Sequence, residues 1–334
     1  MIVRSGSDAR VTECEITEPV DTTDATGEGN RDAIGWSRRP LHRVGTLGAW
    51  GRRKRWHHWC VTTPRDVFSV TFADLDYLGI ASVFVLDRST GETIEDRAVR
   101  PFGWRVVLPD DPLRGLVELR AGAMHLRIDD RGDRVALNVR SRRVSAELEV
   151  TRTANLDTLN LLVPFDRGRF QFNAKQVAMP ARGTVAFAGQ TRRLGAEAFA
   201  CLDYGRGAWP HHTRWNWASG AGTQNGATVG LNLGARWTDG TGVTENGVWV
   251  DGRLQKIHGD VRFEWSAPEP RRPWTITGSD VDLRFTVEHV RAVRDIGLPV
   301  GAGLCLGFGS FAGRAGGVEI RDLFGWAEDF HARW

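Results

Sequence analysis

The residue types best suited to chemistry lie together in one stretch of the chain, residues 200–217. It holds a carboxylate and a guanidinium three residues apart, followed by three indoles: Asp203, Arg206, Trp209, Trp215 and Trp217. Glycines bracket the guanidinium, and glycine accepts backbone angles that are closed to other residues, so the spacing predicts a tight turn. The stretch is therefore the first candidate for an acid–base or ligand-binding site.

Two roles fit Asp203. Nearby indoles would remove water from its carboxyl group and favour the protonated form, which suits a general acid. Arg206, three residues away, would instead pair with the carboxylate, keep it ionised and make the motif a structural clasp. The residue types favour the clasp only slightly, so both interpretations stay open.

Three further side chains extend the predicted site. Glu245 is the second candidate acid, because residues 244–250 read as a short strand with polar groups between apolar ones; a carboxylate at a hairpin end is the alternative. His211 is a predicted proton relay to Asp203. Lys175 would bind a substrate carboxylate or enolate, or else extend its ammonium from a barrel rim. The other predicted ligand-binding residues are polar or aromatic: Arg206, Trp209, Trp215, Trp217, Asn232, Arg236, Trp237, Asn246 and Trp249.

Two pairs of adjacent histidines, His57-His58 and His211-His212, are the best candidates for metal ligands. Adjacent residues of a strand point to opposite faces, so each pair offers at most one ligand, and neither an HxH nor an HExxH pattern is present. The four cysteines lie far apart without a CxxC pair, which argues against a zinc ribbon or a redox motif. The sequence therefore predicts no metal and no cofactor.

Short runs of strand type, separated by turns, extend over most of the chain, and long helical patterns are missing. Meandering strands favour up-and-down barrels, because closure removes exposed edges. We therefore expect an all-β fold of two lipocalin-like (calycin-type) antiparallel barrels. A short C-terminal helix is also predicted, because Trp326, Phe330 and Trp334 repeat every four residues.

The predicted organisation has three parts. Residues 1–34 are polar and aperiodic, which indicates a flexible or wrapping arm. The sequence around Met179–Gly183 breaks the strand pattern and predicts a domain boundary. Residues 35–180 would then form an N-terminal barrel, and residues 181–334 a C-terminal barrel that carries the Asp/Arg/Trp-rich motif.

Charge and hydropathy narrow the class of partner. The net charge of +3 comes from 44 basic and 41 acidic residues mixed along the chain, which argues against nucleic-acid binding. No apolar run is long enough for a membrane span, and the first residues lack the apolar core of a signal peptide, so we expect a cytoplasmic protein. The basic patch Arg52–Arg55 favours a solvated loop, although peripheral membrane contact stays open. The sequence does not reveal the oligomeric state.

Several motifs are spread along nearly the whole chain: Gly35-Trp36-Ser37-Arg38-Arg39-Pro40-Leu41, Phe172-Asn173-Ala174-Lys175, Asp203-Tyr204-Gly205-Arg206-Gly207-Ala208-Trp209-Pro210 and Thr244-Glu245-Asn246-Gly247. Together they resemble the family called domain of unknown function 2804, and residues 301–307 depart from its pattern. That family is distantly similar to double lipocalin-like proteins, which include carotenoid hydratases and tocopherol cyclases. The resemblance implies two barrel-like domains with a ligand site at or between them. It also implies chemistry in which an acid protonates an isoprenoid double bond.

The sequence thus favours a protein that binds an apolar small molecule, isoprenoid or otherwise lipid-like, in a β-barrel cavity. Acid-promoted alkene hydration or cyclisation is the expected activity. A non-catalytic lipid or isoprenoid carrier, which would need the same cavity without a poised acid, is the alternative. A carbohydrate-active protein comes third, because the ExDxxE strand run of common β-sandwich glycosidases is absent.

Overall fold

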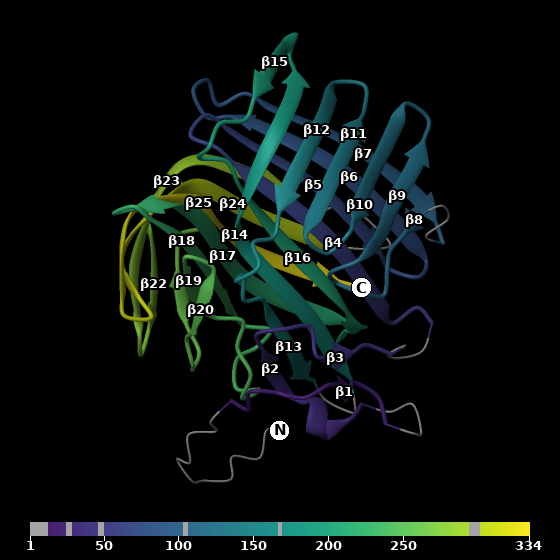
Figure 1. The fold of residues 1–334 in the computed structure, drawn as a ribbon, viewed down its shortest axis with the longest axis vertical. Coiled ribbons are helices and arrows are strands. Elements are labelled where there is room, and N and C mark those ends of the chain that lie inside the picture. The colour runs from purple at the N-terminus through teal and green to yellow at the C-terminus, as the bar shows by residue number, and fades with distance from the viewer. Residues whose placement is uncertain (1–12, 25–28, 46–49, 103–105, 166–168, 294–300) are drawn as a thin grey trace.

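The computed structural model describes residues 13–24, 29–45, 50–102, 106–165, 169–293 and 301–334. Within them, two antiparallel sheets carry nearly all of the regular structure (Figure 1). The one helix among these residues is a short 3-10 turn, η1 (Arg31–Ala33). The all-β prediction is confirmed, and the two curved sheets form two barrel-like, calycin-type domains.

The larger sheet contains 14 strands within the described residues, and its main path runs β7-β6-β5-β4-β16-β14-β12-β11-β10-β9-β8. The bounds on this path are β4 (Arg53–Thr62), β5 (Asp66–Asp74), β6 (Leu78–Asp87), β7 (Thr93–Pro101), β8 (Val106–Val107), β9 (Gly115–Ala121), β10 (Met124–Asp130), β11 (Arg134–Arg140), β12 (Val144–Thr151), β14 (Phe170–Phe187) and β16 (Phe199–Ala208). Three strands branch from it: β2 (Gly35–Ser37), β13 (Leu159–Pro164) and β15 (Gln190–Arg193).

The smaller sheet has nine strands in the described part of the chain, in the order β20-β19-β18-β17-β25-β24-β23-β22-β21. Its strands are β17 (His212–Gln224), β18 (Ala227–Ala235), β19 (Gly247–Val250), β20 (Arg253–Lys256), β21 (Arg262–Glu264), β22 (Trp274–Gly278), β23 (Val281–Val293), β24 (Gly301–Ala315) and β25 (Val318–Arg333). A separate two-stranded sheet joins β1 (Val20–Asp21) to β3 (His42–Arg43).

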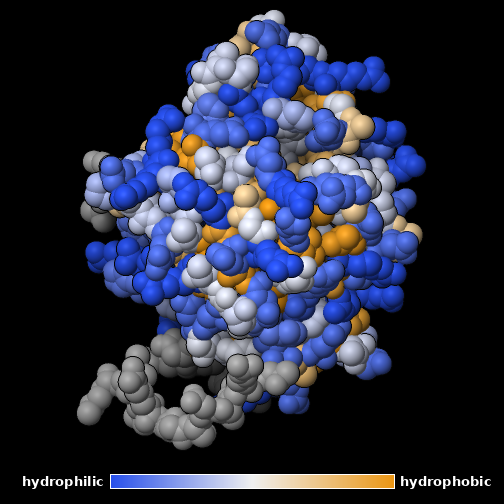
Figure 2. Space-filling model, turned by 90° about the vertical axis from the view of Figure 1, so that its left-hand side faces the viewer, coloured by the Kyte–Doolittle hydropathy of each residue, from blue (hydrophilic) through white to orange (hydrophobic). Residues whose placement is uncertain are grey.

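Alternating sequence places apolar side chains inside each barrel. In β12, Val144, Ala146, Leu148 and Val150 are buried, while the residues between them are more exposed, as the two-residue period of a strand requires. Polar residues cover most of the face shown in Figure 2, and apolar residues gather there in smaller patches. The hydrophobic effect thus accounts for the two barrel cores.

Strand β14 runs through the predicted domain boundary at residue 180. Its first part pairs with β13 and β16, and its last part pairs with β12 and β15. A register shift between Gln176 and Met179, with Ala178 at φ 58°, marks a bulge between the two parts, and bulges bend strands. The chain passes from the larger sheet to the smaller one between β16 and β17, after the predicted boundary.

The predicted C-terminal helix is wrong, because residues 318–333 form strand β25. A four-residue repeat fits one face of a helix, but it also fits one face of a strand, because four is even. This segment is a strand because it pairs with β17 on one side and β24 on the other. The atypical segment 301–307 lies in β24, and its Leu306 is buried between the sheets.

A third apolar core lies between the two sheets, where β14 and β16 pack against β17 and β18 (Figure 1). Phe84 of the larger sheet stacks on Phe308 of the smaller one, with ring centroids 5.8 Å apart. Six buried indoles contribute to this core: Trp36, Trp209, Trp217, Trp237, Trp249 and Trp326. The interface between the barrels is therefore itself a hydrophobic core.

Candidate active site

The predicted acids meet between the sheets, not inside either barrel. In β16, Leu202 and Tyr204 point into the N-terminal barrel core, whereas Cys201 joins the core between the sheets. Asp203 shares the face of Cys201 because the two are two residues apart. In β14, Phe172 and Ala174 face the N-terminal barrel, so Lys175 faces the interface.

Lys175 holds Asp203 and Glu245 together. It is the register partner of Asp203, and its Nζ lies 2.8 Å from Asp203 Oδ1 and 3.0 Å from Glu245 Oε2. The same Nζ lies 4.3 Å from the ring centroid of Trp217, within cation–π range. Burial opposes the charge, but the two carboxylates more than offset it and raise the pKa of Lys175. The ammonium is therefore charged at neutral pH.

Two indoles fix the free oxygens of these carboxylates. Trp56 Nε1 donates to Asp203 Oδ2 at 3.0 Å, and Trp237 Nε1 donates to Glu245 Oε1 at 2.7 Å. A Cβ on Gly234 would lie 1.9 Å from Glu245 Oε1, so the close approach of this carboxylate requires glycine. Burial raises the pKa of Glu245, and Lys175 opposes that shift.

Glu328 is the carboxyl group that sequence reasoning missed. It lies on β25, and Trp215 Nε1 donates to its Oε1 at 2.7 Å. Desolvation raises the pKa of Glu328 to about 7, and Asp203 adds to the rise while Lys175 counters it. The side chain nevertheless keeps some solvent access. It is therefore a carboxyl group that is partly protonated near neutral pH, next to the ion cluster.

His58 adds a neutral imidazole on β4. Burial lowers the pKa of His58 to about 4, against the raising effect of Asp203. Its Nδ1 lies 2.7 Å from Thr71 Oγ1, and its ring meets Trp217 edge-on at 5.9 Å. The neutral ring can accept or donate a proton in a hydrogen bond without adding charge to the site.

An aromatic wall borders the cluster. Trp209 stacks on Trp237 at 5.8 Å and contacts Trp56 and Trp215 at 5.2 and 5.7 Å. Trp215 in turn stacks on Phe330 at 4.1 Å. Several members of the wall and the cluster remain partly accessible to solvent: Trp56, Trp215, Phe330 and the side chain of Asp203, which is 14% exposed. The solvent-accessible margin of the cluster therefore lies along these four side chains.

Arg206 does not pair with Asp203. The two are three residues apart on a strand, so they point to opposite faces, and the predicted glycine-bracketed turn is strand β16. Arg206 Nη1 lies 2.6 Å from Asp110 Oδ1. His211 also lies away from the acid, because it is exposed and its ring contacts His212. The clasp and the proton relay are both wrong.

The remaining predicted residues divide between the site and its supports. Asn232 is close to the cluster, since it accepts from Trp217 Nε1 at 2.8 Å and donates to Glu245 O at 2.7 Å. Asn246 accepts a hydrogen bond from Gly234 N–H and donates one to Gly259 O. Trp249 donates to Asp157 O. Arg236 pairs with Asp329 at 3.3 Å. These last three stabilise the surroundings and do not contact the acids.

All three lysines of the chain have buried side chains. Lys54 Nζ donates to the carbonyls of Gly51 and Arg53. Lys256 Nζ lies 2.5 Å from Glu13 Oε2, and both side chains are buried. This last pair ties Glu13, in the predicted arm, to β20.

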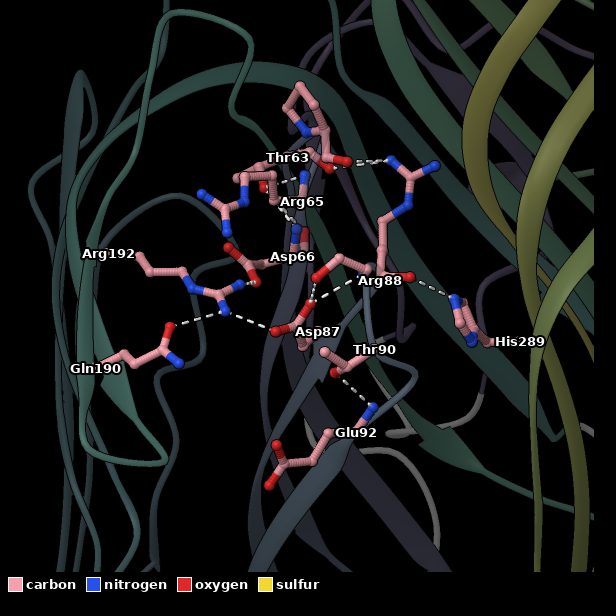
Figure 3. A network of polar contacts seen from close by, with 12 residues as sticks. Thr63, Arg65, Asp66, Asp87, Arg88, Thr90, Glu92, Gln190, Arg192 and His289 are labelled. Atoms are coloured by element: carbon pink, nitrogen blue, oxygen red, sulfur yellow. Dashed lines mark hydrogen bonds and ion pairs between the residues drawn. The ribbon is translucent and has the colours of Figure 1, made fainter.

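A polar network joins the sheets at another place (Figure 3). Arg88 Nη2 lies 3.0 and 3.1 Å from the oxygens of Glu288, and His289 Nε2 lies 3.0 Å from Arg88 O. Nearby, Arg192 pairs with Asp66 and Asp87. Cavities of about 560 and 320 Å³ flank this network, and Lys175, Asp203 and Glu245 line neither. Among the described residues no group of three metal-ligating side chains gathers.

Comparison with known proteins agrees with this architecture. The family described as domain of unknown function (DUF2804) matches residues 13–334. The chain belongs to this family. Comparison with curated proteins finds no match. None of the helices in the described residues has the length and apolar character needed to span a membrane.

Two solved structures share the fold of this DUF2804 chain. Kievitone hydratase from Nectria haematococca is 10% identical, with a TM-score of 0.50 over 84% of this chain and 88% of that chain. CghA, solved with Sch210972, is 13% identical, with a TM-score of 0.55 over 85% of this chain and 89% of that chain. At these identities the likeness shows the two-barrel fold alone.

Proposed function

We propose that this DUF2804 protein binds an apolar small molecule, isoprenoid or otherwise lipid-like, at the margin of the interface site and hydrates or cyclises one of its alkenes by acid catalysis. The observation that carries the proposal is Glu328, because its pKa of about 7 leaves the acid form available at neutral pH. The hydratase fold among the solved structures supports the same reaction class.

In this mechanism the proton of Glu328 adds to one alkene carbon, and the π electrons form the new C–H bond. The carbocation lies beside the rings of Trp215 and Phe330, whose π faces attract positive charge. In hydration, a water oxygen bonds the cationic carbon and its proton returns to Glu328. In cyclisation, a second nucleophile of the same molecule bonds that carbon and releases the proton.

Lys175 and Asp203 have a positioning role. The ammonium pairs with Asp203 at 2.8 Å, so in this mechanism Asp203 is an ion-pair partner and not the acid. Its negative charge disfavours a second anion nearby and so helps to keep Glu328 protonated. Asp203 also offers a fixed anion toward which a carbocation is attracted.

The test uses isoprenoid alkenes, beginning with farnesol. Saturable quenching of tryptophan emission measures binding. Incubation in isotopically labelled water, followed by mass spectrometry, detects hydration, and chromatography of unlabelled products detects cyclisation. Glu328→Gln should keep binding and lower turnover by about 100-fold or more. Glu319→Gln, an exposed carboxylate on the same strand that pairs with Arg321, is the matched control and should leave turnover unchanged.

The pH profile separates this mechanism from others. Turnover should fall as pH rises through about 7, because the acid form of Glu328 is then lost. Binding without turnover of any alkene would identify a carrier instead. Turnover in Glu328→Gln equal to that of the wild type would reject Glu328 as the acid.

A further inference from the structure

The exposed large apolar side chains of the described residues gather at one end of the N-terminal barrel. They are Trp50, Val99, Phe102 and Val107, which are 62%, 48%, 74% and 47% exposed. Gly51 N–H donates to Asp76 at 2.7 Å, and Phe102 N–H donates to Tyr77 O at 2.9 Å. Trp50 and Phe102 therefore flank the same turn, between β5 and β6. We call these four residues the apolar tip.

Arginines lie next to members of the apolar tip in the sequence. Asp76 and Asp74 pair with Arg53 and Arg55. Arg52, which follows Gly51, and Arg100, which follows Val99, have no carboxylate partner among the described residues. The tip therefore combines projecting aromatic rings with a surplus of positive charge.

This combination fits an anionic lipid surface better than a protein partner. Tryptophan and phenylalanine insert at the boundary between headgroups and acyl chains, and nearby arginines are attracted to anionic headgroups. Four side chains are far fewer than the roughly 20–30 residues that each side of a stable protein interface supplies.

The apolar tip is also connected to the candidate active site. Arg52 Nη2 donates to Trp209 O at 2.5 Å, and Trp209 contacts Trp56, whose indole binds Asp203. We propose that the apolar tip docks this protein on membranes that contain anionic lipids. Delivery of an apolar ligand from the membrane to the aromatic wall rests on the proposed function, whereas docking itself does not.

Vesicle flotation tests the docking. Full-length protein is mixed with vesicles of phosphatidylcholine alone, or of equal parts phosphatidylcholine and phosphatidylglycerol. We expect binding to the anionic vesicles that weakens with added salt. Trp50→Ser and Phe102→Ser should each lower the partition coefficient by about tenfold, because each removes a ring that would leave water. Arg142→Gln, an exposed arginine in the β11–β12 turn, is the control and should bind like the wild type.

Three results would overturn docking: no flotation with anionic vesicles, unchanged flotation of the double variant Trp50→Ser/Phe102→Ser, or a wild-type dimer that this variant abolishes in the absence of vesicle binding. Circular dichroism verifies that the variants fold. Turnover of a detergent-dispersed alkene should be the same in the double variant and the wild type. Failure of docking is thereby distinguished from failure of the proposed catalysis.

Discussion

Replacement of Lys175 by Met tests whether one ammonium holds the candidate site together. In the native protein its side chain is 3% exposed, and it lies within 3.0 Å of two carboxylates. Methionine leaves Glu245, only 2% exposed, without its cation. Breaking a buried ion pair by removing one partner costs about 3–5 kcal/mol. The indole hydrogen bonds to both carboxylates persist, so we expect a loss near the lower end of this range at pH about 8.

The loss should depend on pH with a definite sign. Burial already raises the pKa of Glu245, and removal of Lys175, which lowers it, raises that pKa further. A carboxyl group with a raised folded pKa contributes stability below its unfolded pKa, and this contribution disappears as pH rises through the folded pKa. Lys175→Met should therefore be much less destabilised at pH about 5 than at pH about 8.

Urea unfolding, followed by tryptophan emission across this pH range, measures the free energy of unfolding. Lys54→Met is the control, because Lys54 is equally buried but has no carboxylate within ion-pair distance in the described residues. Burial lowers the pKa of Lys54 to about 8, so Lys54 stays largely charged below that pH. The stability lost in Lys54→Met should therefore be nearly constant from pH about 5 to 7. Equal losses for Lys175→Met at both pH values would refute the reasoning.

The other predictions concern separate charges and use the same unfolding measurement. Glu328→Gln should gain stability relative to the wild type as pH rises through about 7, by up to about 3 kcal/mol, because the wild type must then bury a carboxylate; a constant difference would contradict the raised pKa. Asp203→Asn and Arg206→Ala should be additive within about 0.5 kcal/mol, because they lie on opposite faces of β16; a larger coupling would revive the clasp. Glu13→Gln should lower the free energy of unfolding by about 3 kcal/mol, because it leaves Lys256 without its partner. Burial lowers the pKa of Lys256 to about 8. The loss should therefore grow as pH falls through about 8, because the variant must then bury an unpaired ammonium.

The sequence predicted the fold class well because alternation and turn chemistry are local properties. It failed at the C-terminus, where spacing by four is compatible with both a helix and a strand. The strand assignment depends on pairing with β17 and β24, which no local pattern encodes. The same error concealed Glu328, because in a strand it shares a face with Trp326 and Phe330, whereas a helix would turn it away.

The candidate site shows a similar division. Motifs made Lys175, Asp203 and Glu245 candidate site residues, and the structure brings the three together, but proximity in sequence suggested the wrong partner for Asp203. Its partner comes from the register of β14 against β16, in which Lys175 lies opposite Asp203. The alternation of side chains along a strand could have excluded Arg206 as the partner of Asp203, because two residues three positions apart on a strand point to opposite faces. The register itself depends on long-range pairing and was not predictable from one sequence.

The ammonium of Lys175 distinguishes the three carboxyl groups of the site, whereas proximity to tryptophan does not. Trp56, Trp237 and Trp215 each donate one indole hydrogen bond, to Asp203, Glu245 and Glu328 respectively, so indoles do not distinguish the three. The ammonium of Lys175 does distinguish them, because it lies within ion-pair distance of the first two only. Its single charge compensates two anions incompletely, and the remaining negative charge disfavours ionisation of a third carboxyl group nearby. Lys175 therefore holds two carboxylates in place, and Glu328, which forms no ion pair with the described residues, is the group to which we assign the proton in the proposed reaction.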